Sequence, residues 1–140
     1  MAIVDLDTEL AAPAHAVWRA VLTMPAIKHR EDEWREGETV EGWVFLFGVI
    51  PFSHHTLHIS AISDTAMTFS SLESGGLIRR WNHDIIVVAS DDSRCNYRDR
   101  IDIDAGIFTP IVVLYARWFY RTRQRRWRAL ARVLAVEGPN

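Results

Sequence analysis

The stretch GGLIRRWNHDIIVVASDDSRCNYRDRIDID, residues 75–104, decides the fold. It holds two runs rich in β-branched and aromatic residues, 77–89 and 94–104, separated by the polar turn 90–93. Alternate residues of a strand share a face. One predicted face is mostly apolar and carries Trp81, His83, Ile85, Val87, Ala89, Cys95, Tyr97, Asp99, Ile101 and Ile103. The other face carries most of the charge, so the sequence predicts a long hairpin with one wet side.

Two ionisable side chains, His83 and Asp99, fall on the apolar face of this hairpin. Cross-strand partners share a face, and a turn of odd length would place His83 nearly opposite Asp99. The pair has two interpretations. Either the two groups satisfy each other inside a core, or they contact a ligand.

Length and composition point to one domain, residues 1–140, with enough apolar residues (49%) for a substantial core. No run approaches the 18 or so apolar residues that a membrane span needs. The first ten residues lack the basic and then apolar order of a secretion signal, so we expect a cytoplasmic protein. A lone Cys95 excludes an internal disulfide bond and a thiolate metal cluster.

The remaining chain alternates in the same way. Further strands are predicted at residues 3–10, 39–49, 52–62 and 65–73. A short helix starts at Pro13 and stops before Pro25, and a charged loop or second short helix covers residues 28–38. A long helix begins at Pro110.

Several side chains outside the hairpin are candidates for a pocket. Trp43 and Phe45 share a face with Phe47, and such an aromatic row either fills a core or lines a pocket. The neighbouring strands turn His55, Met67 and Phe69 inward. His55 faces away from His54 and His58, so these histidines alone cannot form a zinc site, and neither a metal nor a cofactor is expected.

The last helix is amphipathic. At 100° per residue its packing face is predicted to carry Ile111, Tyr115, Phe119, Thr122, Arg126, Leu130 and Val133. The solvated face is predicted to carry Arg117, Arg121, Arg125, Arg128 and Arg132. Arg126 on the packing face either extends to its edge or reaches an inward acid such as Asp99 or an anionic group of a ligand.

Strand, helix, antiparallel meander and long final helix are the order of a helix-grip fold, an α+β fold. Residues 76–83 (GLIRRWNH) and 97–101 (YRDRI), followed by the helix with Phe119 and Arg126, resemble the START-related SRPBCC superfamily. That superfamily includes polyketide cyclases, lipid-transfer domains and the birch pollen allergen. The resemblance implies a curved antiparallel sheet of about six strands wrapped around the C-terminal helix, and a pocket for a small, largely apolar molecule.

The leading functional hypothesis is a carrier or sensor of a small hydrophobic molecule, acting as a monomer or homodimer without nucleic acid or stable membrane insertion. Its predicted ligand-binding residues are Trp43, Phe45, His55, Met67, Phe69, Trp81, His83, Tyr97, Asp99, Tyr115, Phe119 and Arg126.

Two other classes stay open. The first is a cyclase or aromatase in which His83 is the general base, Asp99 holds it and Tyr97 donates to a developing enolate. The second is an interaction protein that uses the arginines between 117 and 132 on RNA, DNA or an anionic membrane, although a pI near 6.3 argues against nucleic acid. A nucleophilic hydrolase fits least, because no serine stands in a strained turn before a helix.

Overall fold

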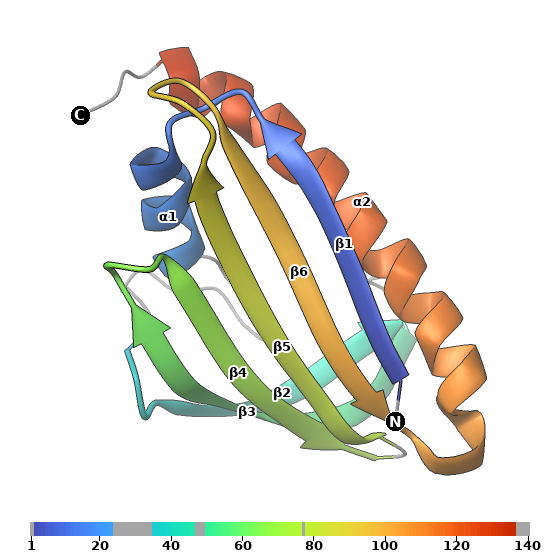
Figure 1. The fold of residues 1–140 in the computed structure, drawn as a ribbon. Helices are drawn as coiled ribbons and strands as arrows, with labels where there is room; N and C mark the ends of the chain where they lie inside the picture. The colour runs from blue at the N-terminus through green and yellow to red at the C-terminus, as the bar shows by residue number, and fades with distance from the viewer. Residues whose placement is uncertain (1, 24–34, 47–49, 77, 137–140) are drawn as a thin grey trace.

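The sheet is the main body of the molecule. The computed structural model describes residues 2–23, 35–46, 50–76 and 78–136, without the side chains of residues 40, 42–46, 50–55 and 136. Antiparallel strands form a six-stranded sheet in the spatial order β1-β6-β5-β4-β3-β2 (Figure 1). The strands are β1 (Ala2–Leu10), β2 (Thr39–Leu46), β3 (Ile50–Ser63), β4 (Thr68–Gly75), β5 (Ile78–Ala89) and β6 (Cys95–Asp104).

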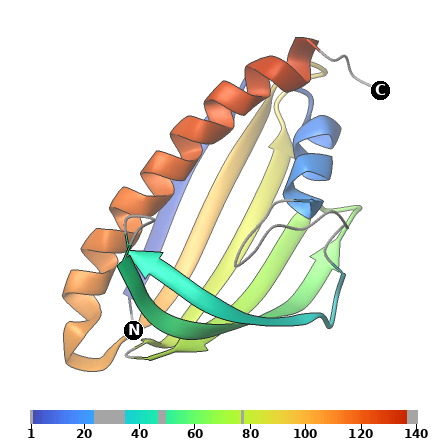
Figure 2. The same ribbon diagram turned by 180° about the vertical axis from the view of Figure 1, so that it is seen from behind.

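The helices lie together on the concave side of this sheet (Figure 2). They are α1 (Ala14–Leu22), the 3-10 turn η1 (Gly106–Phe108) and the long α2 (Thr109–Val136), which runs beside β1. Among the residues described, no helix combines the length and apolar character needed to cross a bilayer. The helix-grip fold predicted from the sequence, with its six strands and long final helix, is confirmed.

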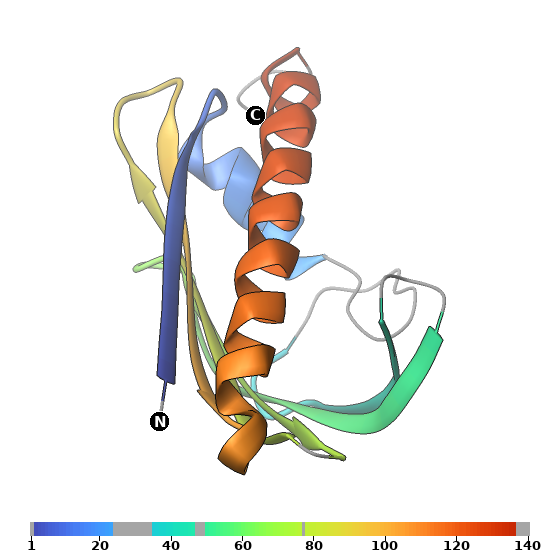
Figure 3. The same cartoon turned by 90° about the vertical axis from the view of Figure 1, so that its right-hand side faces the viewer.

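The curvature of the sheet is concentrated in one half. The pairs β1–β6 and β5–β6 run without a register shift, whereas β2–β3, β3–β4 and β4–β5 each contain one, near Phe45, Ala61 and Gly75. An extra residue on one strand bends that strand and increases its twist. As a result, β2 and β3 sweep round toward the side on which α2 lies (Figure 3).

The outer face of the sheet is charged, as predicted, and its charges are paired across strands. Arg98 on β6 forms an ion pair with Asp5 on β1. Arg94 lies 3.1 Å from Glu9, and Arg80 lies 3.2 Å from Asp102. Such exposed pairs contribute little stability each, but they fill the wet face with polar groups and leave the inner face to form the core.

Two predictions about local structure are wrong. Met67 does not belong to a strand, because its φ of 53° places it in a turn and β4 begins at Thr68. The packing face of α2 is also not the predicted one. Its buried residues are Ala116, Tyr120, Gln124, Trp127 and Ala131, whereas Ile111 is 67% exposed and Leu130 and Val133 are exposed as well. Arg126 is exposed too, so its predicted place on the packing face is wrong.

Candidate functional site

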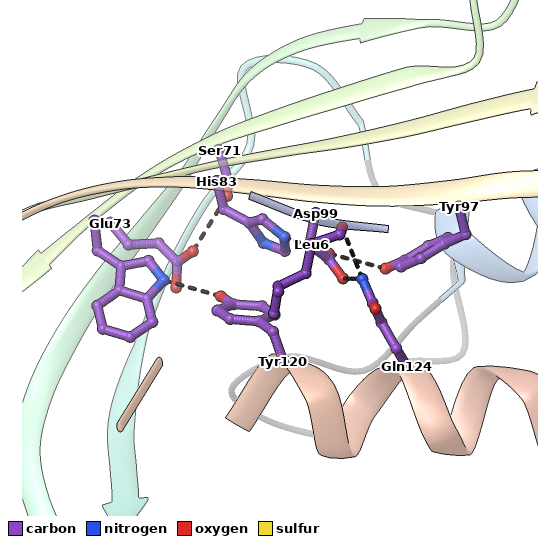
Figure 4. Close-up of polar contacts among 9 residues, drawn as sticks. Leu6, Ser71, Glu73, His83, Tyr97, Asp99, Tyr120 and Gln124 are labelled. Carbon is purple, nitrogen blue, oxygen red and sulfur yellow. Dashed lines mark hydrogen bonds and ion pairs between the residues drawn. The ribbon is translucent and has the colours of Figure 1, made fainter. Parts of the chain in front are cut away.

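The interior contains two apolar clusters with a polar layer between them. The cluster near α1 includes Trp18, Phe69, Ile85, Val87 and Trp127. The cluster at the other end of α2 includes Val4, Ile78, Trp81, Ile101, Ile103 and Ala116. The polar layer is formed by Ser71, Glu73, His83, Tyr97, Asp99, Tyr120 and Gln124, which Figure 4 shows, together with Arg123.

The alternation of three strands and one turn of α2 creates this layer. Ser71 and Glu73 project inward from β4, His83 from β5, and Tyr97 and Asp99 from β6, since each pair is two residues apart on its strand. On α2, residues 120, 123 and 124 share a side because three and four residues make one helical turn. Between the two apolar clusters, the side chains that fill the space between the sheet and α2 are therefore polar.

The carboxylate of Asp99 is the centre of the hydrogen bonds. His83 Nε2 lies 2.7 Å from its Oδ1, and the Tyr97 hydroxyl donates to the same oxygen over 3.2 Å. The amide of Gln124 donates to Oδ2 over 3.1 Å and to the carbonyl of Leu6 over 2.9 Å. Buried ions require such partners, and Asp99 is only 1% exposed. The carboxylate thus connects β5, β6 and α2.

The predicted contact between His83 and Asp99 is present, but the predicted register is not. Ile101 is the cross-strand partner of His83, and Ile85 is the partner of Asp99. The two ionisable residues are therefore diagonal neighbours on one face, a separation that a long side chain such as histidine can bridge.

Glu73 stands at the edge of the polar layer and is half-buried. Ser71 Oγ donates to Glu73 Oε2 over 3.2 Å. Burial raises the pKa of this carboxyl above its ordinary value of 4.5, and the charges of His83 and Arg123 and the Ser71 hydrogen bond offset that effect only in part. Figure 4 shows the carboxyl group turned toward Ser71 and Tyr120.

Tyr120 brings a hydroxyl from α2 into the same region. It accepts a hydrogen bond from Trp81 Nε1 over 2.9 Å, and its ring centroid lies 4.8 Å from that of His83. Burial, followed by the charge of Glu73, raises the pKa of Tyr120 well above its ordinary value, so the hydroxyl keeps its proton.

Hydrogen-bonding capacity remains unused within the polar layer. Among the described residues, His83 Nδ1, the Tyr120 hydroxyl proton and the second oxygen of Glu73 have no hydrogen-bond partner. The imidazole, the phenol and the carboxyl group each retain a donor or acceptor for a further molecule. Glu73 and Arg123 are only half-buried, so solvent reaches the polar layer at these two residues.

Eleven of the twelve predicted site residues divide into three groups, and the twelfth, Arg126, is exposed on α2. His83, Tyr97 and Asp99 lie in the polar layer, with Trp81 beside it. Phe69 and Met67 pack in the cluster near α1, while Tyr115 and Phe119 are half-buried against the other cluster. The predicted pocket residues Trp43, Phe45 and His55 lie on β2 and β3, and their side chains are outside the described part of the chain.

Sequence reasoning missed Glu73, Tyr120, Arg123 and Gln124. Strand parity gave a signal for Glu73, because it shares a face with Phe69 and Ser71. Gln124 also stands out as an uncharged polar residue in an arginine-rich run. The signal on α2 was hidden because apolar residues occur on its exposed side as well.

The outer face of the sheet has a hollow of its own, with a volume of about 480 Å³. Its lining includes Ile3, Ser60, Leu72, Asn82 and Arg100. This hollow is open and lies on the charged side of the sheet, away from the polar layer, so the interior is the better candidate site.

Comparison with solved structures places the fold. A START superfamily protein from Mycobacterium smegmatis superposes with a TM-score of 0.73 at 13% identity, covering 94% of this chain and 98% of that one. The Zhui aromatase/cyclase from Streptomyces sp. R1128 gives 0.58 at 17% identity, covering 75% and 68%. Norcoclaurine synthase from Thalictrum flavum, in complex with dopamine and hydroxybenzaldehyde, gives 0.59 at 12% identity, covering 81% of each chain. The chain thus has the same helix-grip fold as these three proteins.

A narrower assignment comes from the sequence itself. Residues 27–132 match a family described as "Domain of unknown function (DUF8410)", and the chain belongs to that family. No curated protein matches the sequence.

Proposed function

We propose that this protein binds a small, mostly hydrophobic molecule between the sheet and α2, with one polar group of that molecule held by the polar layer. The observation that carries the proposal is the hydrogen-bonding capacity of His83, Tyr120 and Glu73 that no other described residue uses, between two apolar clusters. Binding sites for small molecules combine apolar walls with a few such polar groups. Such a binding site is sufficient for a carrier or a sensor, which does not need catalytic groups.

The chemistry of these groups narrows the class of ligand. Tyr120 offers a proton donor, His83 Nδ1 offers a donor or an acceptor according to the form of the ring, and Glu73 offers either according to its protonation. A hydroxyl, phenol or carbonyl group on an apolar skeleton satisfies this set. The solved norcoclaurine synthase complex, with dopamine and hydroxybenzaldehyde, supports the same class of ligand for this fold.

Fluorescence titration tests the proposal, using anilinonaphthalene sulfonate and a fluorescent fatty acid as probes. We expect saturable binding at one site, weakened roughly fivefold to tenfold by Tyr120→Phe or Glu73→Gln, the contribution of one hydrogen bond. Asp102→Asn on the outer face is the matched control and should leave the affinity unchanged. Leu114→Gln, at an exposed position of α2, reports adhesion of the probe to the surface.

Two results would contradict the proposal. One is the absence of saturable binding for both probes. The other is an equal loss of affinity in Asp102→Asn and in the Tyr120 and Glu73 variants. Native mass spectrometry of protein purified from its own host adds an independent readout, because a co-purifying mass would give the ligand directly.

An acid–base enzyme of the cyclase kind is the second candidate, favoured by the 2.7 Å contact between His83 and Asp99. In this proposal His83 Nδ1 is the general base and Asp99 orients the ring. The hydroxyl of Tyr97 already donates to Asp99 and is fully buried, so the donor to a developing enolate is Tyr120 instead.

The two candidates differ in what happens to a bound molecule. An enzyme would change the mass of a ligand recovered after incubation, and His83→Gln would abolish that change while the fold survived. A carrier or sensor would release the ligand unaltered. Recovery of unaltered ligand from every incubation would remove the cyclase candidate.

A further inference from the structure

The N-terminal part of α2 presents an apolar surface to solvent. This surface, here called the apolar end of α2, consists of Ile111, Leu114 and Trp118 of α2 together with Ile107 and Phe108 of the preceding turn η1. Leu114 is 70% exposed and Trp118 is 48% exposed. Spacings of three and four residues place Ile111, Leu114 and Trp118 along one side of the helix, opposite the buried side. Of these residues, only Ile111 belonged to the predicted packing face of the helix.

The same exposed side becomes basic further along the helix. Arg121, Arg125, Arg128 and Arg132 are all exposed there and form what we call the arginine half of α2. The helix contains no aspartate or glutamate at all, although the whole chain has a net charge of −2. On neighbouring β1, Asp5 and Glu9 are already paired with arginines near β6. Within the described part of the chain, Arg121, Arg125 and Arg132 have no carboxylate partner, and their charge is available to another molecule.

We propose that this side of α2 docks reversibly on an anionic lipid bilayer. Aliphatic and aromatic side chains at one end suit the boundary between head groups and acyl chains, where tryptophan is enriched. Arginine pairs with lipid phosphates through two parallel hydrogen bonds. The lengthwise separation of the two kinds of residue indicates a tilted helix, with its apolar end inserted and its arginine half on the head groups.

A second copy of the chain or a nucleic acid would contact only part of the exposed side of α2. A stable dimer buries about 800 Å² on each partner, with some 20 to 30 residues a side, which is far more than the apolar end offers. A nucleic acid would neutralise the arginines but leave Ile111 and Leu114 in water. A bilayer accounts for both halves.

A chain of ring contacts connects the docking surface with the polar layer. Trp118 contacts Tyr115 at 5.8 Å between ring centroids, Tyr115 contacts Phe119 at 6.0 Å, and Phe119 contacts Tyr120 at 5.1 Å. An apolar molecule leaving the bilayer at Trp118 would meet aromatic surface as far as the candidate site. This delivery role rests on the proposed function, whereas docking itself does not.

Vesicle flotation with no added ligand tests the docking. We expect the full chain to float with vesicles containing about 30% phosphatidylglycerol, to stay in solution with pure phosphatidylcholine, and to be released at about 0.5 M salt. Replacing Arg121, Arg125 and Arg132 by glutamine should weaken the binding roughly 100-fold, since each arginine near an anionic surface contributes roughly fivefold. Leu114→Gln should weaken it about tenfold or more.

Matched controls lie elsewhere on the molecule. Arg19, Arg94 and Arg100 are exposed arginines away from α2, and their triple change to glutamine alters the net charge equally. Leu72→Gln is the control for Leu114→Gln, because Leu72 is exposed on the outer face of the sheet. We expect both controls to bind vesicles as tightly as the natural sequence.

Several outcomes would overturn the proposal. They are the absence of flotation with anionic vesicles, equal losses in the controls and the α2 variants, and a dimer in sedimentation that Leu114→Gln dissociates, which would assign the surface to a second copy. Preferential binding of RNA that survives Leu114→Gln would equally reject the bilayer. Flotation that persists while both fluorescent probes fail to bind would reject the ligand site and leave the docking surface standing.

Discussion

His83 and Asp99 are held 2.7 Å apart although each faces a different residue across the strands. The diagonal contact leaves room for Tyr97 and Gln124 to donate to the same carboxylate. The buried carboxylate of Asp99 thus connects the sheet with α2 through hydrogen bonds. The effect of removing it on stability can be measured.

Asp99→Ala should strongly destabilise the fold. The change leaves the donors of His83, Tyr97 and Gln124 buried without an acceptor, and breaking a buried ionic network in this way costs about 3 to 5 kcal/mol. Urea denaturation measures the loss. Asp102→Ala, whose partner Arg80 is on the outer face, should cost less than about 1 kcal/mol. Similar losses in the two variants would show that the buried carboxylate has no special role.

Glu73 should make the protein less stable as pH rises. Because burial raises its pKa in the folded chain, the folded state holds this proton more tightly than the unfolded state does. The free energy of unfolding therefore falls from pH 4.5, the ordinary value, up to the raised folded pKa, and the full penalty remains above it.

Glu73→Gln should remove that penalty. The variant keeps an acceptor for Ser71, so its stability relative to the natural sequence should increase with pH across this window and then level off. Denaturation at a series of pH values measures the difference, with the exposed Glu41→Gln as control. A relative stability that is independent of pH would contradict the assignment.

Cys95 should be unreactive in the folded protein. Its thiol is fully buried, and burial, with a smaller contribution from Glu9, raises its pKa to about 11. We expect modification by a disulfide reagent at pH 8 to be at least about 100-fold slower than in denaturant, since thiolate is the reacting form. Fast modification of the folded chain would mean that β6 opens readily near its start.

Replacing each of the two tryptophans of α2 by alanine should have very different effects on stability. Trp127 is 6% exposed and its ring lies 4.9 Å from that of Tyr97, so Trp127→Ala should cost about 3 to 5 kcal/mol. Trp118 on the exposed side offers the matched comparison, and Trp118→Ala should cost about 1 kcal/mol or less. Thermal or urea denaturation distinguishes them. Equal losses would contradict the assignment of the buried side of α2.

The strands could be predicted from the sequence because strict alternation of polar and apolar residues fits a half-buried strand and no other structure. In residues 77–104 polar and apolar side chains alternate, and only one face can be buried. That rule assigned His83, Tyr97 and Asp99 to the interior correctly. It could not supply the register, because the loop closes between Ala89 and Cys95, and a shift of two residues keeps every side chain on the same face.

The helix was harder because both of its sides carry apolar residues. Ile111 and Leu114 are as hydrophobic as a core stripe, whereas the buried side contains Gln124 and the half-buried Arg123. A polar residue is stable inside only when a partner from another element meets it, as Asp99 and the Leu6 carbonyl meet Gln124. Such partners are set by tertiary structure, and no local pattern contains them.

The position of β1 at the edge of the sheet has a consequence for the order of folding. Among the described strands it pairs with β6 alone, nearly a hundred residues later in the sequence, so residues 2–10 wait as an unpaired segment while the later hairpins close. Pulsed hydrogen exchange during refolding should find the β1 amides protected in the last phase, after those of β4 and β5. Protection of β1 in the first phase would mean that the two distant strands meet before any hairpin is complete.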